Sequence, residues 1–277
     1  MRTTRGIATL PSIAGLTLIV GLALIVNSGG IPTTGHPRAT PTTDTVTTHG
    51  EWVKFANAKG DSVRAYVAYP ERKDKAPTVI VIHEIFGLTD WEPTMGDHFA
   101  AQGYIAVVPD LLSSRWGTSP AAADSGRKLV ALLTPDGVNA DLDAAYRYVN
   151  ALPAARKERT GVIGFCWGGG TVWRYASANP KLKAAVVCYG PLADTMLLKT
   201  VKAPILGVYG ENDMRVNATT PDIQRILAAQ GTPFSSDSYP GTGHGFLKPG
   251  RKGAGTAEAA RALANIDAFF AKQLEQK

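Results

Sequence analysis

Residues 164–170 read GFCWGGG, and Cys166 is the residue of this run with a nucleophilic side chain. The run before it (159–165) is typical of a buried parallel strand, and the small and aromatic residues after it (171–179) predict a helix that ends before Pro180. Glycines beside a reactive residue let a strand and a helix approach closely, so that the side chain stands clear of both. The stretch therefore predicts a strand, a sharp turn that presents the Cys166 thiol, and a helix. A glycine-rich turn around a buried structural cysteine is the alternative interpretation.

Outward from this turn, strand-like and helix-like segments alternate along the chain. An antiparallel hairpin comes first, with alternating apolar and polar residues at 52–55 and 62–69 around a turn at 59–61. The later strands are apolar runs of the kind found in parallel sheets that are covered on both faces. We predict strands at 77–82, 104–108, 159–165, 184–188, 204–209 and 234–239, and helices at 92–102, 121–133, 138–152, 171–179, 221–229 and 257–274. This order predicts an α/β fold with a mostly parallel, doubly wound sheet flanked by helices and with antiparallel N-terminal strands.

The length and the charge of the chain fit one such domain. The chain has 277 residues, of which 44% are hydrophobic and 19% are charged, so it can bury one large core. The net charge is +6, and part of it comes from Arg2, Arg5 and Arg38 in the N-terminal tail. The sequence has no block of five or more Lys or Arg residues. The charge therefore gives no indication of a nucleic-acid partner.

The N-terminal segment differs from the rest of the chain. Residues 1–28 have a basic start and then an uncharged apolar run from Ile7 to Val26, which predicts a cleaved signal peptide or an uncleaved membrane anchor. Residues 29–48 are rich in Thr, Pro and Gly, a composition that predicts a disordered linker. We expect a folded domain at 49–277 that is exported or anchored outside the cytoplasm, with membrane contact through the N-terminal segment alone.

Candidate catalytic residues follow the carboxyl ends of the predicted strands, where open α/β sheets place their ligand sites. Glu84 and its neighbour His83 follow the first apolar strand, and Cys166, Asp213 and His244 each follow a later one. A nucleophile, then an acid, then a histidine, in this chain order, is one of the known orders of a catalytic triad. His244 can accept the thiol proton, and Asp213 can hold the other nitrogen of the imidazole ring.

Each of these residues also has a simpler interpretation. Asp213 could form a turn, with Glu211 as a rival acid, and Glu84 could be a surface carboxylate. His83 is expected to pack or to hydrogen-bond locally rather than to catalyse. The strongest alternative is a disulfide between Cys166 and Cys188 in an exported binding protein with no catalytic function, because such a bridge would consume the nucleophile.

The motifs together resemble the dienelactone hydrolase family of α/β-hydrolases. The similar stretches are HEIFG at 83–87, VPDL at 108–111, GFCWGG at 164–169, Gly-x-x-Asp at 210–213 and GHGF at 243–246. The resemblance implies Cys166 as the nucleophile, with His244 and Asp213 as its partners. It also implies that Glu84 takes the thiol proton once substrate arrives, and that the backbone N–H groups of Ile85 and Trp167 form the oxyanion hole.

Two positions concern the substrate. Lactone hydrolases of this family hold a substrate carboxylate with two arginines, and the corresponding positions here are Arg115, one residue later than the pattern, and Lys248. A lysine is a point charge without the two-pronged geometry of arginine, so carboxylate recognition would be looser. We expect a monomeric, cofactor-independent cysteine hydrolase of small carboxylic esters or lactones, with no metal because the spacing of the triad residues is not that of a zinc site.

Overall fold

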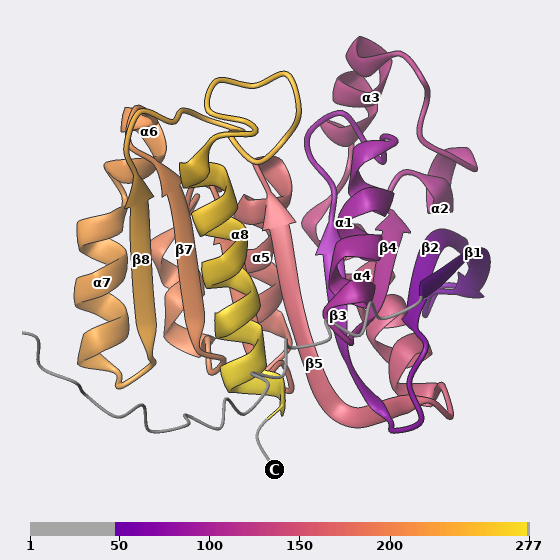
Figure 1. Cartoon of the computed structure of the whole chain (residues 1–277). Helices are drawn as coiled ribbons and strands as arrows, with labels where there is room; N and C mark the ends of the chain where they lie inside the picture. Colours follow the sequence, from indigo (N-terminus) through magenta and orange to yellow (C-terminus); the bar gives the residue numbers. More distant parts are fainter. Residues whose placement is uncertain (1–47, 276–277) are drawn as a thin grey trace, which may run out of the picture. The chain divides into compact units, whose positions relative to one another are not determined.

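The computed structural model describes residues 48–275, which form an open sheet with helices on both faces (Figure 1). The sheet has eight strands in the order β1-β2-β4-β3-β5-β6-β7-β8. The pairs β1–β2 and β2–β4 are antiparallel, and all other neighbouring pairs are parallel. The strands are β1 (Thr48–Ala56), β2 (Ser62–Pro70), β3 (Ala76–Ile82), β4 (Ile105–Asp110), β5 (Ala155–Phe165), β6 (Ala184–Cys188), β7 (Ile205–Gly210) and β8 (Phe234–Tyr239). The predicted mostly parallel α/β sheet with an N-terminal hairpin is confirmed.

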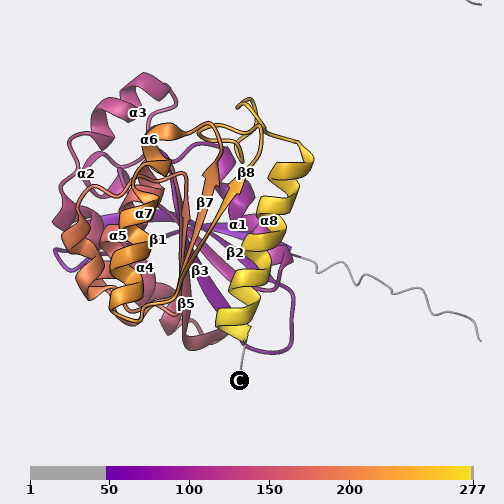
Figure 2. The ribbon, with the colours of Figure 1, turned by 90° about the vertical axis from the view of Figure 1, so that its left-hand side faces the viewer.

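The helices cover the two faces of this sheet. Figure 2 shows α1 and α8 on one side of the strands and α4, α5 and α7 on the other. These longer helices are α1 (Trp91–Ala101), α4 (Pro135–Ala151), α5 (Trp167–Ala178), α7 (Thr220–Ala229) and α8 (Ala257–Phe270), which continues into the π-helical turn η2 (Ala271–Glu275). The shorter ones are α2 (Ser113–Trp116), α3 (Ala123–Val130), the 3-10 helix η1 (Thr195–Thr200) and α6 (Met214–Asn217).

Two hydrophobic cores result, one on each face of the sheet. On the face of α1 and α8, the rings of Phe99 and Phe270 pack edge to face, with centroids 5.6 Å apart, against the buried side chains of β3 to β7. On the opposite face, Leu142 of α4 and Trp173 of α5 are fully buried. The central strands are therefore apolar on both faces, which explains why they read as continuous apolar runs in the sequence.

Some boundaries and elements differ from the sequence-based expectation. β5 begins at Ala155, four residues earlier than predicted, because the charged residues 156–159 continue the strand beyond the apolar run. Glu158 has a positive φ of 59°, and the register between β3 and β5 shifts in this region. The short elements α2, α6 and η1 were not predicted, since a single helical turn carries no hydrophobic period that a sequence could show.

The N-terminal segment 1–28 and the linker up to residue 47 lie outside the described residues, so their export or anchoring role stays a prediction. Within residues 48–275, no helix has both the length and the apolar character that crossing a membrane requires.

The parallel strands all point the same way, so their carboxyl ends meet at one edge, which is the upper edge in Figure 1. The loops that follow β3, β5, β7 and β8 at this edge carry Glu84, Cys166, Asp213 and His244. The fold thus collects at one place four residues that are far apart in the sequence.

Candidate active site

Cys166 occupies a sharp turn between β5 and α5. Its backbone has φ 56° and ψ −113°, a region that non-glycine residues rarely adopt and that costs roughly 1–3 kcal/mol. The turn is held from both sides, because the Cys166 N–H donates to the carbonyl of Cys188 (3.0 Å) and the Gly170 N–H donates to the carbonyl of Cys166 (3.1 Å). The turn therefore presents the side chain at the upper edge of the sheet, half-buried rather than enclosed.

Two glycines make this turn possible. A Cβ atom on Gly164 would lie 2.2 Å from the carbonyl oxygen of Gly168, and one on Gly168 would lie 2.5 Å from the carbonyl oxygen of His83. Both obstacles are backbone atoms, which cannot move aside as a flexible side chain can. The predicted strand–turn–helix, with glycines required by close approach, is thus the local structure that the chain adopts.

Cys166, His244 and Asp213 form a continuous chain of contacts. His244 Nε2 lies 3.0 Å from Cys166 Sγ, and His244 Nδ1 lies 2.5 Å from Asp213 Oδ2. Asp213 is buried at the start of α6, whereas the His244 side chain, in the loop after β8, is 35% exposed. The rival acid Glu211 instead accepts a hydrogen bond from the Gly241 N–H (2.8 Å). The geometry is that of a nucleophile, a base and an acid that orients the base.

The protonation of His244 depends on this arrangement. The hydrogen bond with Cys166 raises the pKa of His244 from 6.5 to about 9, and the hydrogen bond with Asp213 adds to the effect, while burial of the ring opposes it. A raised pKa means that one proton stays on the Cys166–His244 pair at neutral pH and is lost as the pH rises through about 9. The pair can therefore hold a thiolate beside an imidazolium.

The titration of His244 is expected to change when the thiol is removed. In the wild-type protein the proton shared by Cys166 and the His244 ring should be lost near pH 9, and in Cys166→Ala the ring should titrate at a clearly lower pH, because the largest cause of the shift is gone. NMR titration of the His244 ring protons measures both values. Cys166→Ser is the matched control, since it keeps a hydrogen-bonding group without an accessible negative charge. An unchanged titration in Cys166→Ala would show that the thiol does not interact with the ring in solution.

The predicted oxyanion donors come from two segments that are packed together. Trp167 is the first residue of α5, where helix geometry leaves the backbone N–H groups without a partner in the preceding turn. Ile85 lies in the loop after β3. His83, two residues before it, stacks on the Trp167 ring with centroids 5.4 Å apart and an interplanar angle of 14°. His83 Nδ1 also lies 2.7 Å from the Glu84 carbonyl oxygen, so His83 packs and hydrogen-bonds locally, as predicted.

Glu84 is paired with the ammonium group of Lys248. Lys248 Nζ lies 3.0 Å from Glu84 Oε2 and 3.5 Å from Glu92 Oε1. Both carboxylates are buried, with Glu84 2% exposed and Glu92 fully covered. The sequence placed Glu92 at the start of a predicted helix, but it gave no sign that this carboxylate would meet Lys248.

Arg115 makes its contacts elsewhere. Its guanidinium donates to the carbonyl of Leu132 (2.9 Å) and lies over the Trp116 ring on α2. Of the two residues expected to bind a substrate carboxylate, Lys248 is thus the one that pairs with Glu84.

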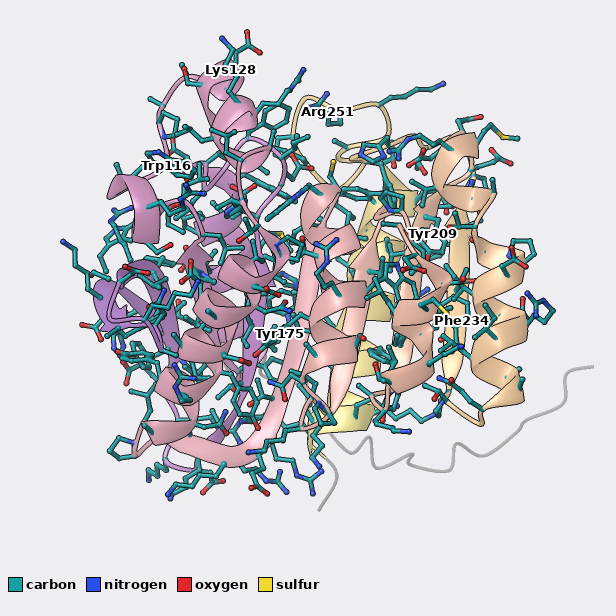
Figure 3. The ribbon with its side chains drawn as sticks, turned by 180° about the vertical axis from the view of Figure 1, so that it is seen from behind. Trp116, Lys128, Tyr175, Tyr209, Phe234 and Arg251 are labelled. Atoms are coloured by element: carbon teal, nitrogen blue, oxygen red, sulfur yellow. The ribbon has the colours of Figure 1, made fainter. Side chains whose placement is uncertain are left out.

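Two arginines other than Arg115 lie near Lys248, around the ring of Phe86. Arg127 of α3 and Arg251 both lie over the ring of Phe86, at 5.3 and 5.8 Å from its centroid, and Lys248 lies 5.7 Å from the same point. Figure 3 shows Arg251 in the loop after β8, at the same upper end of the molecule as Lys128 of α3. Nothing in the sequence links these two arginines, because they meet only through the packing of α3 and the last loop around Phe86.

The two cysteines are both free thiols, so the disulfide considered as an alternative is not formed. Cys188 ends β6 beside Phe165 of β5 and is fully buried, and burial raises the pKa of its thiol well above the usual value. Cys166 is therefore the cysteine with a partner for proton transfer. Within residues 48–275, no cluster of three or more His, Cys, Asp or Glu side chains is arranged to hold a metal ion.

Comparison with known proteins identifies similar chains. Residues 63–274 match the model of the dienelactone hydrolase family. A putative carboxymethylenebutenolidase of Salmonella typhimurium is 34% identical over 230 residues, which cover 78% of this chain and 84% of that protein. A carboxymethylenebutenolidase homolog of Mus musculus is 29% identical over 214 residues, which cover 72% of this chain and 81% of that protein.

Solved structures agree in their fold. The crystal structure of a putative dienelactone hydrolase from Klebsiella pneumoniae superposes with a TM-score of 0.74 at 28% sequence identity, covering 82% of this chain and 99% of the other. A dienelactone hydrolase-like promiscuous phosphotriesterase from metagenomic libraries, with 20% identity and a TM-score of 0.72, shares the fold. The eight-stranded sheet is therefore that of an α/β-hydrolase.

Proposed function

Because this chain belongs to the dienelactone hydrolase family, and is therefore a hydrolase of carboxylic esters or lactones, we propose that it acts through Cys166 as a covalent nucleophile. The observation that carries the proposal is the contact of Cys166 Sγ with His244 Nε2 at 3.0 Å, continued by the contact of His244 with Asp213. The substrates proposed are small carboxylic esters or lactones. The names of the relatives as carboxymethylenebutenolidases, enzymes that open a lactone, support this class.

The first half of the reaction forms an acyl-enzyme. The Cys166 thiolate attacks the carbonyl carbon, and the negative charge that develops on the carbonyl oxygen is stabilised by the backbone N–H groups of Ile85 and Trp167. The bond to the alcohol oxygen then breaks, and that oxygen takes the proton from His244. With a pKa raised to about 9, the ring beside a thiolate is protonated at neutral pH and ready to donate.

The second half releases the acid. His244 Nε2 removes a proton from a water molecule, which attacks the thioester carbonyl, and the Cys166–carbonyl bond breaks. The thiolate and the imidazolium are regenerated, and the carboxylic acid leaves. Asp213 keeps the ring oriented and balances its charge during both halves.

Glu84 has the role of a base that is held back at rest. We propose that, when substrate is bound, it takes the thiol proton and passes it to His244, after which His244 and Asp213 stabilise the charged pair. Its contact with Lys248 (3.0 Å) supports a resting state in which the carboxylate is occupied, and its position directly after β3 supports access to the site.

A panel of small esters and lactones tests the proposed activity. Purified protein is expected to hydrolyse several of them. An ester whose acyl-enzyme forms faster than it is hydrolysed should give a burst of alcohol release equal to the enzyme concentration. Mass spectrometry of the quenched reaction should find the acyl group on the peptide that contains Cys166. Turnover without any acylated Cys166 would contradict the covalent mechanism while leaving the family's hydrolase activity intact.

A further inference from the structure

One buried carboxylate near the site has no part in the reaction described above. Glu92 lies in the first turn of α1 and is fully covered. Its Oε2 accepts hydrogen bonds from the backbone N–H of Thr89 (2.8 Å) and from the Thr89 hydroxyl (2.5 Å). Its Oε1 points the other way and lies 3.5 Å from Lys248 Nζ.

The ammonium group of Lys248 therefore lies between two buried carboxylates. It is 3.0 Å from Glu84 and 3.5 Å from Glu92, and its side chain is only 16% exposed. The Thr89 hydroxyl lies 3.3 Å from the same nitrogen. Two negative charges thus share one positive charge, and Lys248 remains paired with a carboxylate if either one leaves.

This arrangement matters at the moment when Glu84 turns toward the thiol. A largely buried ammonium that loses its counter-ion is strongly destabilised, because neither water nor another charge replaces the lost interaction. With a single carboxylate on Lys248, the release of Glu84 would require another anion, such as a carboxylate on the substrate. With Glu92 in place, the ammonium keeps a counter-ion inside the protein.

On the basis of the proposed role of Glu84, we propose that Glu92 is a positioning residue that retains Lys248 when Glu84 turns to Cys166, so that uncharged esters and lactones are acylated without any substrate anion. Glu92 acts through Lys248 and does not touch the reacting atoms. The proposed substrates are therefore acyl compounds that need not carry a negative charge. A substrate with an anionic group is accepted, but the anion is not required.

Glu92 also accepts hydrogen bonds from the backbone N–H and the hydroxyl of Thr89 just before α1, and this structural role must be separated from the first. The variant Glu92→Gln separates the contacts with Thr89 from the charge beside Lys248. Its amide oxygen can still accept both hydrogen bonds from Thr89, but the side chain carries no charge. The other end of the amide then faces Lys248 and the Glu84 N–H, which lies 3.5 Å from Glu92 Oε1. Loss of that backbone contact would slow all substrates equally, so a difference between substrates reports on the charge beside Lys248.

The experiment compares two substrates of the same size, a neutral ester and its analogue with a free carboxylate on the acyl part. In Glu92→Gln, acylation of the neutral ester is expected to slow by about 10- to 100-fold, as for the loss of a hydrogen bond or close contact to a charged group. Its KM should change little. The carboxylate analogue should be slowed much less, because its own anion can replace Glu92 at Lys248, so the ratio of the two acylation rates should shift toward the anion.

The matched control is Thr134→Ala, which removes a helix cap far along the chain, where the Thr134 hydroxyl accepts from the Gly137 N–H. It should lower the melting temperature without changing the ratio of the two acylation rates. A Glu92→Gln variant with unchanged acylation of both substrates, or with both slowed equally, would overturn the proposal.

The wild-type protein gives a test that needs no variant. Its acylation by the neutral ester should be within about tenfold of its acylation by the carboxylate analogue. A larger difference in rate would mean that the substrate anion lowers the activation free energy of acylation by more than about 1.4 kcal/mol. Failure on the neutral ester combined with rapid acylation by the anion would reject the role of Glu92, yet leave the Cys166 mechanism standing. Loss of the Cys166 acyl-enzyme with every substrate would instead reject the proposed function itself.

Discussion

Replacement of Cys166 by alanine is expected to abolish hydrolysis of every ester and lactone that the wild-type protein accepts. Removal of a covalent nucleophile from a triad lowers kcat by roughly 10⁴- to 10⁶-fold, because binding and the oxyanion donors alone provide little catalysis. The fold should persist, since alanine meets the same positive φ of 56° as cysteine and leaves the glycine contacts of the turn unchanged. Steady-state rates together with circular dichroism melting separate loss of chemistry from loss of structure.

Cys188 provides the control for this experiment. It is fully buried with a raised thiol pKa, so Cys188→Ala should retain hydrolysis, and a slight excess of an alkylating agent should label Cys166 first. Full ester turnover in Cys166→Ala, or equal labelling of the two thiols in the folded protein, would place the nucleophile elsewhere.

Glu84→Gln is expected to lower the acylation rate by about 10²- to 10⁴-fold, which is the usual effect of losing a general base. Glutamine keeps the shape of the side chain but cannot accept the thiol proton, and it also releases Lys248 to pair with Glu92 alone. Stopped-flow measurement of the alcohol burst gives the acylation rate directly. Substrate binding, measured from the concentration dependence of the burst, should be much less affected.

The same chemical change at an exposed position is the control. Glu71→Gln alters a carboxylate that pairs with His49 at the surface and should leave the burst unchanged. Wild-type acylation in Glu84→Gln would return Glu84 to a structural role. So would thiolate absorbance showing Cys166 fully ionised at neutral pH before substrate is added, because no thiol proton would then remain for Glu84 to take.

The sequence was sufficient to predict those parts of the site that follow directly from strand ends. Cys166, Asp213 and His244 each come at the end of an apolar strand, and parallel strands bring such ends to one edge whatever the detailed packing. The close contacts among the three could thus be expected from topology. The residues alone left Glu211 open as a rival acid, and the resemblance to the family implied Asp213. The structure directs Asp213 to His244 and Glu211 to the Gly241 N–H.

Contacts that depend on the approach of separate elements could not be predicted. Lys248 meets Glu92 because the last loop packs against the start of α1, and Arg127 meets Arg251 only around the ring of Phe86. Arg115 is the opposite case, since its position after the VPDL motif suggested the site while the short helix α2 directs it to the Leu132 carbonyl. Such pairings are set by loop geometry, for which a single sequence has no periodic signal.

The close backbone contacts around the turn also determine where this enzyme could be altered by protein engineering. A Cβ atom on Gly190 would lie 2.2 Å from the Gly169 carbonyl carbon, and Gly164 and Gly168 are blocked in the same way, so substitution at these glycines would displace the nucleophile itself. Gly243 differs, because a Cβ atom there meets nothing within 4 Å and its φ is not positive, although it directly precedes His244. Directed evolution for new substrates should therefore retain substitutions at Gly243 more readily than at Gly164, Gly168 or Gly190.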